Sequence, residues 1–155
     1  MEKKEWRFRK LGDGKEIDVI KYVKEFLAKN PNSDLFIGCD SHNTGRLTHY
    51  ATVIVLHESC KGGHVLYDRR SFPRIYDKFT RLFREVELSV DIAELLKESG
   101  VPKPKYIDID LNPDPKFQSN TVLRAALGFV TSMGYTPRCK PDGVIASRVA
   151  DSLCK

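Results

Sequence analysis

The chain has 155 residues, of which 41% are hydrophobic and 30% charged, with a formal net charge of +5. This length is typical of one domain, and the proportions exclude a disordered chain and a fibrous protein. No apolar stretch approaches the length of a membrane span, and the charged start MEKKEWRFRK lacks the apolar segment of a signal peptide. We therefore expect a single domain over residues 1–155, a cytoplasmic location and no membrane partner.

The cysteines and histidines are too scattered for a zinc site. No two of the four cysteines form a C-x-x-C pair, and the four histidines lack the helical i, i+4 pairing of zinc proteases. We expect reduced, mostly buried thiols, and we expect any metal to be bound by oxygen atoms. The basic excess is compatible with a polyanionic partner such as nucleic acid.

The first predicted elements are one helix and three strands. An amphipathic helix begins after Gly12–Gly14 and ends at Asn30–Pro31, so the segment GDGK is interpreted as a helix start and not as a phosphate loop. Strands are predicted at residues 35–40, 50–57 and 64–69. The short glycine-containing turns between these strands favour antiparallel hairpins.

Helices and strands then alternate to the end of the chain. A long helix is predicted over residues 75–99, and its packed face carries Phe79, Val86, Val90 and Ala93. The remaining elements are a strand at 106–110, a helix at 119–133, a short strand at 135–140 and a last helix at 141–153.

This order predicts an α/β fold built on a five-stranded mixed sheet with helices on both faces. Three antiparallel hairpin strands precede two helix crossovers, and right-handed crossovers place the later strands parallel to the first. Residues 1–32, with their extra helix, form an N-terminal extension. Ligands of such sheets bind beyond the carboxyl ends of the parallel strands.

Two aspartates close strands that this topology makes neighbours. Asp40 ends the first strand and Asp110 the fourth, while Asp108 lies deeper on the same face as Asp110. Taken singly, Asp40 and Asp110 resemble turn formers. Two carboxylates at one edge repel each other unless a cation lies between them, so the pair predicts a hard divalent ion such as Mg²⁺.

Glu87 of the long helix is a third candidate acid. It lies on the flank of the packed stripe, from which a side chain can reach over the sheet edge, whereas Glu85 lies farther round the helix. Flank glutamates commonly face solvent, and this alternative stays open.

The segments that carry these acids resemble ribonuclease H-like nucleases. CDSHNTGRLTHYATVIV resembles their first hairpin, ELSVDIA the part of the first helix that carries the catalytic glutamate, and IDIDLN the fourth strand with its terminal aspartate. Through IGCDSHNTG, GYTPRCKPDG and ASRVADSLCK, the chain most resembles the YkuK-type bacterial proteins, a small ribonuclease H-like family. The resemblance covers about residues 35–155.

This resemblance implies a metal-dependent nuclease that hydrolyses phosphodiester bonds in RNA, DNA or a hybrid. The reaction would use two Mg²⁺ or Mn²⁺ ions, which stabilise the attacking and leaving oxygens. Carried over by motif, Asp40, Glu87 and Asp110 match the first three acids of the family, and Asp40 would bridge both ions.

The fourth acid has two candidates. By motif Asp151 resembles the last-helix aspartate, whereas by geometry Asp142 is favoured because it starts the helix that leaves the fifth strand. Nine residues span about 13 Å of helix and end on roughly opposite faces, so only one of the two can join the site. Each aspartate also has an alternative role outside the site: Asp142 would stabilise a helix N-terminus, and Asp151 would pair with Arg148.

Four further residues are candidates for substrate binding. Ser41, His42 and Asn43 follow Asp40, and Lys140 ends the fifth strand at the same edge. Turn formation explains the first three equally well, and solvent exposure explains the lysine. Residues 6–9 alternate aromatic and basic side chains, as single-strand binders do, but an edge strand or a tail is favoured.

Two other classes of function compete with catalysis. The first is a non-catalytic nucleic-acid-binding module that keeps the fold and uses its basic surface. The second is a scaffold protein whose N-terminal helix covers a partner or a second copy of the chain, which would form a homo-oligomer.

Overall fold

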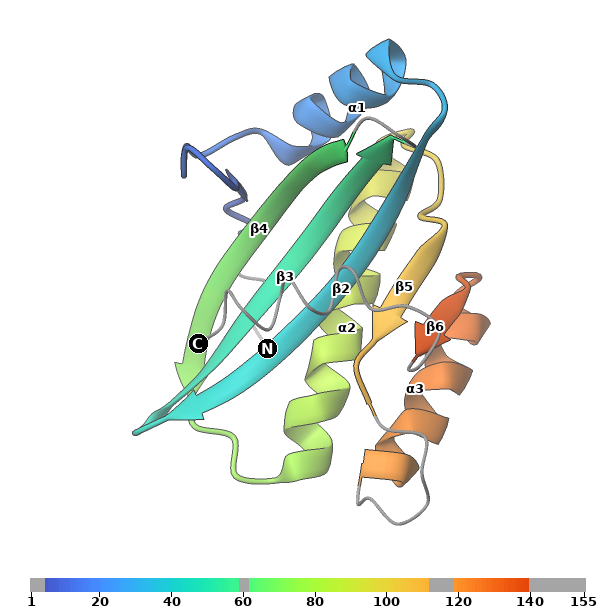
Figure 1. The fold of residues 1–155 in the computed structure, drawn as a ribbon. Coiled ribbons are helices and arrows are strands. Elements are labelled where there is room, and N and C mark those ends of the chain that lie inside the picture. The colour runs from blue at the N-terminus through green and yellow to red at the C-terminus, as the bar shows by residue number, and fades with distance from the viewer. Residues whose placement is uncertain (1–4, 59–61, 112–118, 140–155) are drawn as a thin grey trace.

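The computed structural model describes residues 5–58, 62–111 and 119–139. In these ranges six strands form one mixed sheet in the order β1-β4-β3-β2-β5-β6, accompanied by three helices (Figure 1). The predicted α/β class with its mixed sheet is confirmed. The sheet has one strand more than predicted because the N-terminal segment adds an edge strand. None of the helices in this part of the chain is long and apolar enough to cross a membrane.

The N-terminal extension completes the sheet and its core. Strand β1 (Arg9–Lys10) pairs antiparallel with β4, and the neighbouring Phe8 is 1% exposed. The half-buried Trp6 packs against the same core, so both aromatic rings contribute to packing. Helix α1 (Val19–Lys29) is capped by Asp18, which accepts a hydrogen bond of 3.2 Å from the Lys21 amide.

Strands β2 (Ser33–Thr44), β3 (Leu47–Glu58) and β4 (Gly62–Pro73) form the two predicted antiparallel hairpins. The first hairpin is longer than predicted, and its turn is Gly45–Arg46, with Gly45 at φ +57°. Ser41, His42 and Asn43 are therefore strand residues, paired with β3, and the prediction that the strand ends at Asp40 is wrong. The physical reason is that β3 pairs with β2 up to Thr44 and provides hydrogen-bond partners for the backbone of β2 over this length.

Two short strands extend the sheet beyond β2. Strand β5 (Tyr106–Ile109) runs parallel to β2, and β6 (Pro137–Cys139) runs parallel to β5, as the crossovers predict. Helices α2 (Lys78–Glu98) and α3 (Ser119–Ser132) lie side by side, and α1 lies at the opposite end of β2 from the hairpin turn (Figure 1). The predicted last helix lies outside the described residues.

The main core lies between the sheet and its helices. Ile37, Ile54 and Leu66 of the sheet and Ile92 and Leu96 of α2 are at most 1% exposed and belong to one cluster. Burial of each such side chain contributes roughly 1.5–3 kcal/mol. A second cluster on the opposite face holds Phe36, Ala51, Val53 and Val55. Because both faces of β2 and β3 are buried, the sequences of these strands are continuous apolar runs without alternating polar residues.

Candidate active site

Asp40 of β2 and Asp110, the residue that follows β5, lie the same number of residues beyond the last pair of these parallel strands. The last parallel pair of β2 and β5 joins Gly38 to Asp108, and each aspartate follows its member of that pair by two residues. A two-residue step returns a side chain to the same face of a sheet. Both aspartates are half-buried, and Oδ1 of Asp110 is buried.

The acid of α2 that contacts β2 next to Asp40 is Glu85. It meets Ser41 on the face of the sheet opposite to the Asp40 side chain, because successive side chains of a strand alternate between its two faces. The Glu85 side chain is 4% exposed and accepts a hydrogen bond from the Ser41 hydroxyl of β2. Burial raises the pKa of Glu85 well above its usual value, the charge of Asp40 raises it further, and Asp110 adds a smaller increase. The carboxylates of Asp40 in β2 and of Asp110 after β5 therefore act on the buried carboxylate of α2.

Glu87 lies elsewhere on the helix. Two residues correspond to about 200° around an α-helix, so Glu85 and Glu87 face nearly opposite directions. The Glu87 side chain is 40% exposed, and its Oε2 lies 3.8 Å from Nη1 of Arg84. The structure thus places Glu87 in a surface ion pair, and it brings Glu85 to Ser41 instead.

The sequence contains a second apolar stripe on α2 that would have identified Glu85 as a buried residue. Leu88, Ile92 and Leu96 recur at helical spacing, and Glu85 stands one turn before them. All four are buried. Helix α2 packs with α3 as well as with the sheet, as the 5.5 Å distance between the ring centroids of Phe83 and Phe129 shows. It therefore has a second buried stripe, and a glutamate within it is an unusual residue.

Arg81 is a site residue that the sequence-based prediction missed. Its Nη1 donates to the Ser41 hydroxyl at 2.7 Å, and its carbonyl oxygen accepts from the Tyr50 hydroxyl at 2.9 Å. Ser41 in turn donates to Glu85. Arg81, Ser41 and Glu85 therefore form one hydrogen-bonded chain that joins α2 to β2 beside Asp40.

The other residues predicted to bind substrate have different surroundings. His42 is exposed, whereas Asn43 donates from Nδ2 to the Ile75 carbonyl at 3.4 Å and accepts from the Thr48 hydroxyl. Asn43 thus ties the first hairpin to the segment before α2. Lys140 and both candidates for the fourth acid, Asp142 and Asp151, lie outside the described residues.

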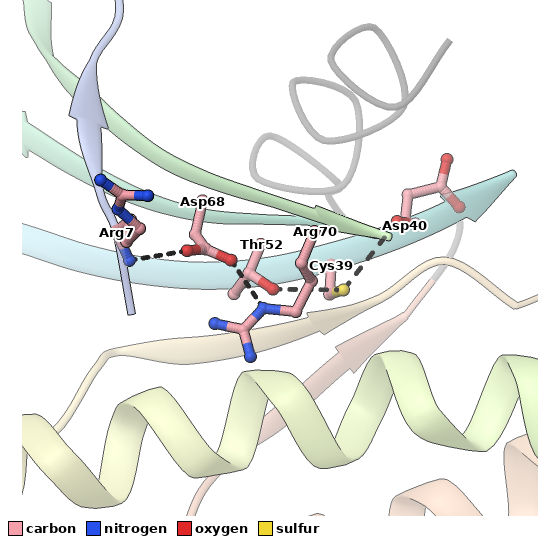
Figure 2. A network of polar contacts seen from close by, with 6 residues as sticks. All are labelled: Arg7, Cys39, Asp40, Thr52, Asp68 and Arg70. Carbon is pink, nitrogen blue, oxygen red and sulfur yellow. Dashed lines mark hydrogen bonds and ion pairs between the residues drawn. The ribbon is translucent and has the colours of Figure 1, made fainter. Parts of the chain in front are cut away.

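The backbone beside Asp40 is held by the interior of the sheet. Figure 2 shows Cys39 directed toward Thr52, whose hydroxyl donates to the Cys39 sulfur at 3.5 Å, while the Asp40 carboxylate points away from both. The same view shows Asp68 joining the Arg7 amide, at 2.9 Å, to Arg70 Nε, at 2.8 Å. Cys39 is 3% exposed, as expected of a buried thiol.

Asp108 is committed to a structural ion pair. Arg138 donates to its two carboxylate oxygens from Nε at 2.8 Å and from Nη2 at 3.0 Å. The guanidinium of Arg138 also lies 4.9 Å and 4.7 Å from the ring centroids of Phe36 and Tyr106. Asp108 has no exposed side-chain surface, which leaves Asp110 as the acid of this strand that approaches the rim.

We expect Asp108→Asn to lower the free energy of unfolding by about 3–5 kcal/mol, because it removes one partner of a buried pair. Urea denaturation measures the change. The matched control is Asp34→Asn, since Asp34 is 44% exposed and lies 3.4 Å from Lys105. An exposed pair of this kind contributes about 0–1 kcal/mol. Equal losses in the two variants would contradict a structural role for the Asp108 pair.

The donor atoms around Asp40 suit a hard divalent cation. Asp40, Glu85 and Asp110 supply carboxylate oxygens, and a cation would relieve the repulsion from the two aspartates that adds to the effect of burial on the pKa of Glu85. Among residues 5–58, 62–111 and 119–139, however, no three His, Cys, Asp or Glu side chains are grouped closely enough to form a ready-made metal site. The residues fit the ion in chemistry but are not preassembled around it.

Comparison with known proteins gives the same family as the sequence motifs. Residues 18–155 match the family model described as Ribonuclease H-like. The chain is also 27% identical over 154 residues to the uncharacterized protein YkuK of Bacillus subtilis (strain 168), a match that covers 89% of this chain and 90% of that protein.

Proposed function

The chain belongs to the ribonuclease H-like family, and from this premise we propose that it is a metal-dependent nuclease that hydrolyses phosphodiester bonds. The observation that supports this most is that the charges of Asp40, within β2, and of Asp110, just after β5, both add to the raised pKa of Glu85 on α2. Ligands of α/β sheets bind beyond the carboxyl ends of the parallel strands. The net charge of +5 favours a polyanionic substrate.

In this proposal Asp40, Glu85 and Asp110 hold Mg²⁺ or Mn²⁺, and two ions are expected by analogy with the family. Such ions supply an activated water and neutralise the charge that develops on the phosphate. Glu85 replaces Glu87 as the helix acid. The fourth acid is Asp142 or Asp151.

The chain's own residues prepare this site before metal or substrate binds. Ser41 holds Glu85 through a hydrogen bond, and Arg81 holds Ser41. The positive charge of Arg81 also lowers the pKa of Glu85, against the larger effects of burial and Asp40. Arg81 and Ser41 are therefore positioning residues, which keep the Glu85 carboxylate in one rotamer beside β2.

The proposal is tested with a panel of labelled single-stranded, double-stranded and hybrid oligonucleotides. Purified protein is incubated with Mn²⁺, with Mg²⁺ or with EDTA, and products are separated on denaturing gels. Cleavage that depends on the metal and co-elutes with the protein supports the nuclease. If no substrate is cut under any metal condition, the catalytic proposal is wrong.

The second candidate is a nucleic-acid-binding protein without catalysis. The lack of a preassembled group of three metal ligands in the described part of the chain favours it. It predicts salt-sensitive binding to nucleic acid without turnover. The same panel separates the two candidates, because a binding protein retains the oligonucleotides intact.

A further inference from the structure

An aromatic and basic surface adjoins the candidate active site. We name it the hairpin–helix surface and define it by Arg46 and Leu47 of the first hairpin and by Arg74, Tyr76, Lys78 and Phe79 before and within the start of α2. Tyr76 is 82% exposed, and Leu47 and Phe79 are 43% and 41% exposed. Figure 1 shows the hairpin turn and the start of α2 at the same end of the molecule.

The backbone on either side of Tyr76 is firmly held. The Arg74 amide donates to the Arg46 carbonyl at 2.9 Å, and the Ile75 amide donates to the Thr48 hydroxyl at 2.9 Å. On the other side Asp77 caps α2 and accepts from the Thr80 amide at 2.9 Å. The backbone that carries the exposed Tyr76 ring is thus fixed, which lowers the entropic cost of ordering this segment when a ligand binds.

The segment that carries this ring is rich in basic residues. Residues 74–84 contain four basic side chains and one acid, Asp77, which is engaged as the cap of α2. The Arg74 guanidinium lies 5.3 Å from the centroid of the Tyr76 ring, in a cation–π arrangement, and Nη1 of Arg74 donates to the Gly45 carbonyl at 2.8 Å. Arg46, at the turn of the hairpin, adds a further charge.

The surface leads directly to the candidate site. Arg81 lies little more than one helical turn after Tyr76, and it donates to Ser41, the neighbour of Asp40. Asn43, two residues beyond Ser41, donates to the carbonyl of Ile75, the neighbour of Tyr76. A strand lying over the surface would therefore extend toward Asp40.

We propose that the hairpin–helix surface binds single-stranded nucleic acid, with an unpaired base stacked on Tyr76 and the adjacent phosphates beside Arg46, Arg74 and Lys78. An exposed aromatic face among basic side chains recognises unpaired bases, which a duplex keeps in its own stack. The inference rests on the proposed function and narrows its substrate to a single strand or to an unpaired segment of a longer molecule.

The test measures binding of a fluorescein-labelled 12-nucleotide single strand and of the matching blunt duplex by fluorescence anisotropy in EDTA, where metal-dependent cleavage is absent. Tyr76→Ala is expected to weaken single-strand binding by about 5- to 150-fold, the cost of one lost base stack. Tyr76→Phe keeps the ring and should stay within about twofold of the wild type. Met133→Ala is the control, because Met133 is an exposed apolar side chain distant in sequence from this surface, 37% exposed.

An abasic scan makes the test specific for stacking. Removing the base that contacts Tyr76 should weaken binding to the wild type and to Tyr76→Phe, but not to Tyr76→Ala. The surface is rejected if Tyr76→Ala binds the single strand as tightly as the wild type does, or if the wild type binds no single strand. If the protein cleaves nucleic acid but Tyr76→Ala changes neither binding nor cleavage, the surface is wrong and the nuclease proposal stands. If binding depends on Tyr76 but nothing is cleaved, the nuclease proposal is wrong and the surface stands.

Discussion

Replacing Asp40 by asparagine is expected to lower the rate of Mn²⁺-dependent cleavage by at least about a hundredfold. The substitution removes a carboxylate charge that the proposal assigns to the metal, and metal ions contribute several kcal/mol to the stabilisation of such transition states. Asparagine has nearly the same shape, and Asp40 is only half-buried, so the fold should be retained. The measurement is the single-turnover rate on the best substrate of the panel.

The matched control for this variant is Asp34→Asn in the same strand. Asp34 is 44% exposed and lies near Lys105, at the other end of β2 from the hairpin turn. Its replacement should leave cleavage within about twofold of the wild type, as is usual for surface changes of this kind. If Asp40→Asn preparations cut as fast as the wild type, the activity belongs to a contaminant or to another site.

The second large effect separates two glutamates of α2. Glu85→Gln should reduce cleavage by at least about a hundredfold for the same reason as Asp40→Asn, whereas Glu87→Gln should leave it within about twofold. Both substitutions remove one charge from the same helix, so each controls for the other. If Glu87→Gln reduced the cleavage rate more than Glu85→Gln does, Glu87 and not Glu85 would be the acid of the helix.

The stability of the metal-free protein gives an independent measure of Glu85. The pKa of Glu85 in the folded state is raised above its ordinary value of 4.5. Between the pKa of the unfolded chain and that of the folded protein, Glu85 therefore binds more protons in the folded state. This group therefore makes the free energy of unfolding fall as pH rises through that interval. Ser41 can still donate to the amide oxygen of glutamine.

In EDTA, Glu85→Gln should consequently be more stable than the wild type at pH 8, and the difference should shrink toward pH 4. Chemical denaturation at several pH values measures it. Glu87→Gln, which changes an exposed side chain, should follow the wild type at every pH. A Glu85→Gln protein with the same pH dependence as the wild type would show that Glu85 carries no raised pKa.

The order and pairing of strands β2 to β6 follow from local sequence signals. The apolar runs of β2 and β3, the glycine of the turn and the helical periodicity of α2 were sufficient for the mixed sheet, because a right-handed crossover leaves few arrangements for β5. The same rule predicted that Asp40 and Asp110 share an edge. Their equal offset from the pair of Gly38 and Asp108 agrees with that prediction.

The extent of β2 depended on its neighbour and not on its own residues. Ser41 and Asn43 are typical of turns, yet β3 hydrogen-bonds the backbone of β2 as far as Thr44. A turn-forming side chain therefore remains in a strand when a partner strand offers a full set of backbone bonds and a better turn follows. Gly45 provides that turn with its positive φ.

The sequence by itself determined the fold class and the neighbouring positions of Asp40 and Asp110. Only the tertiary structure decided that Glu85 and not Glu87 reaches Ser41, that Arg81 holds this contact, and that Tyr76 stands exposed beside it. The reason is physical: periodicity gives the apolar stripes of a helix but not its rotation against two neighbours. That rotation is fixed by packing between residues far apart in the chain.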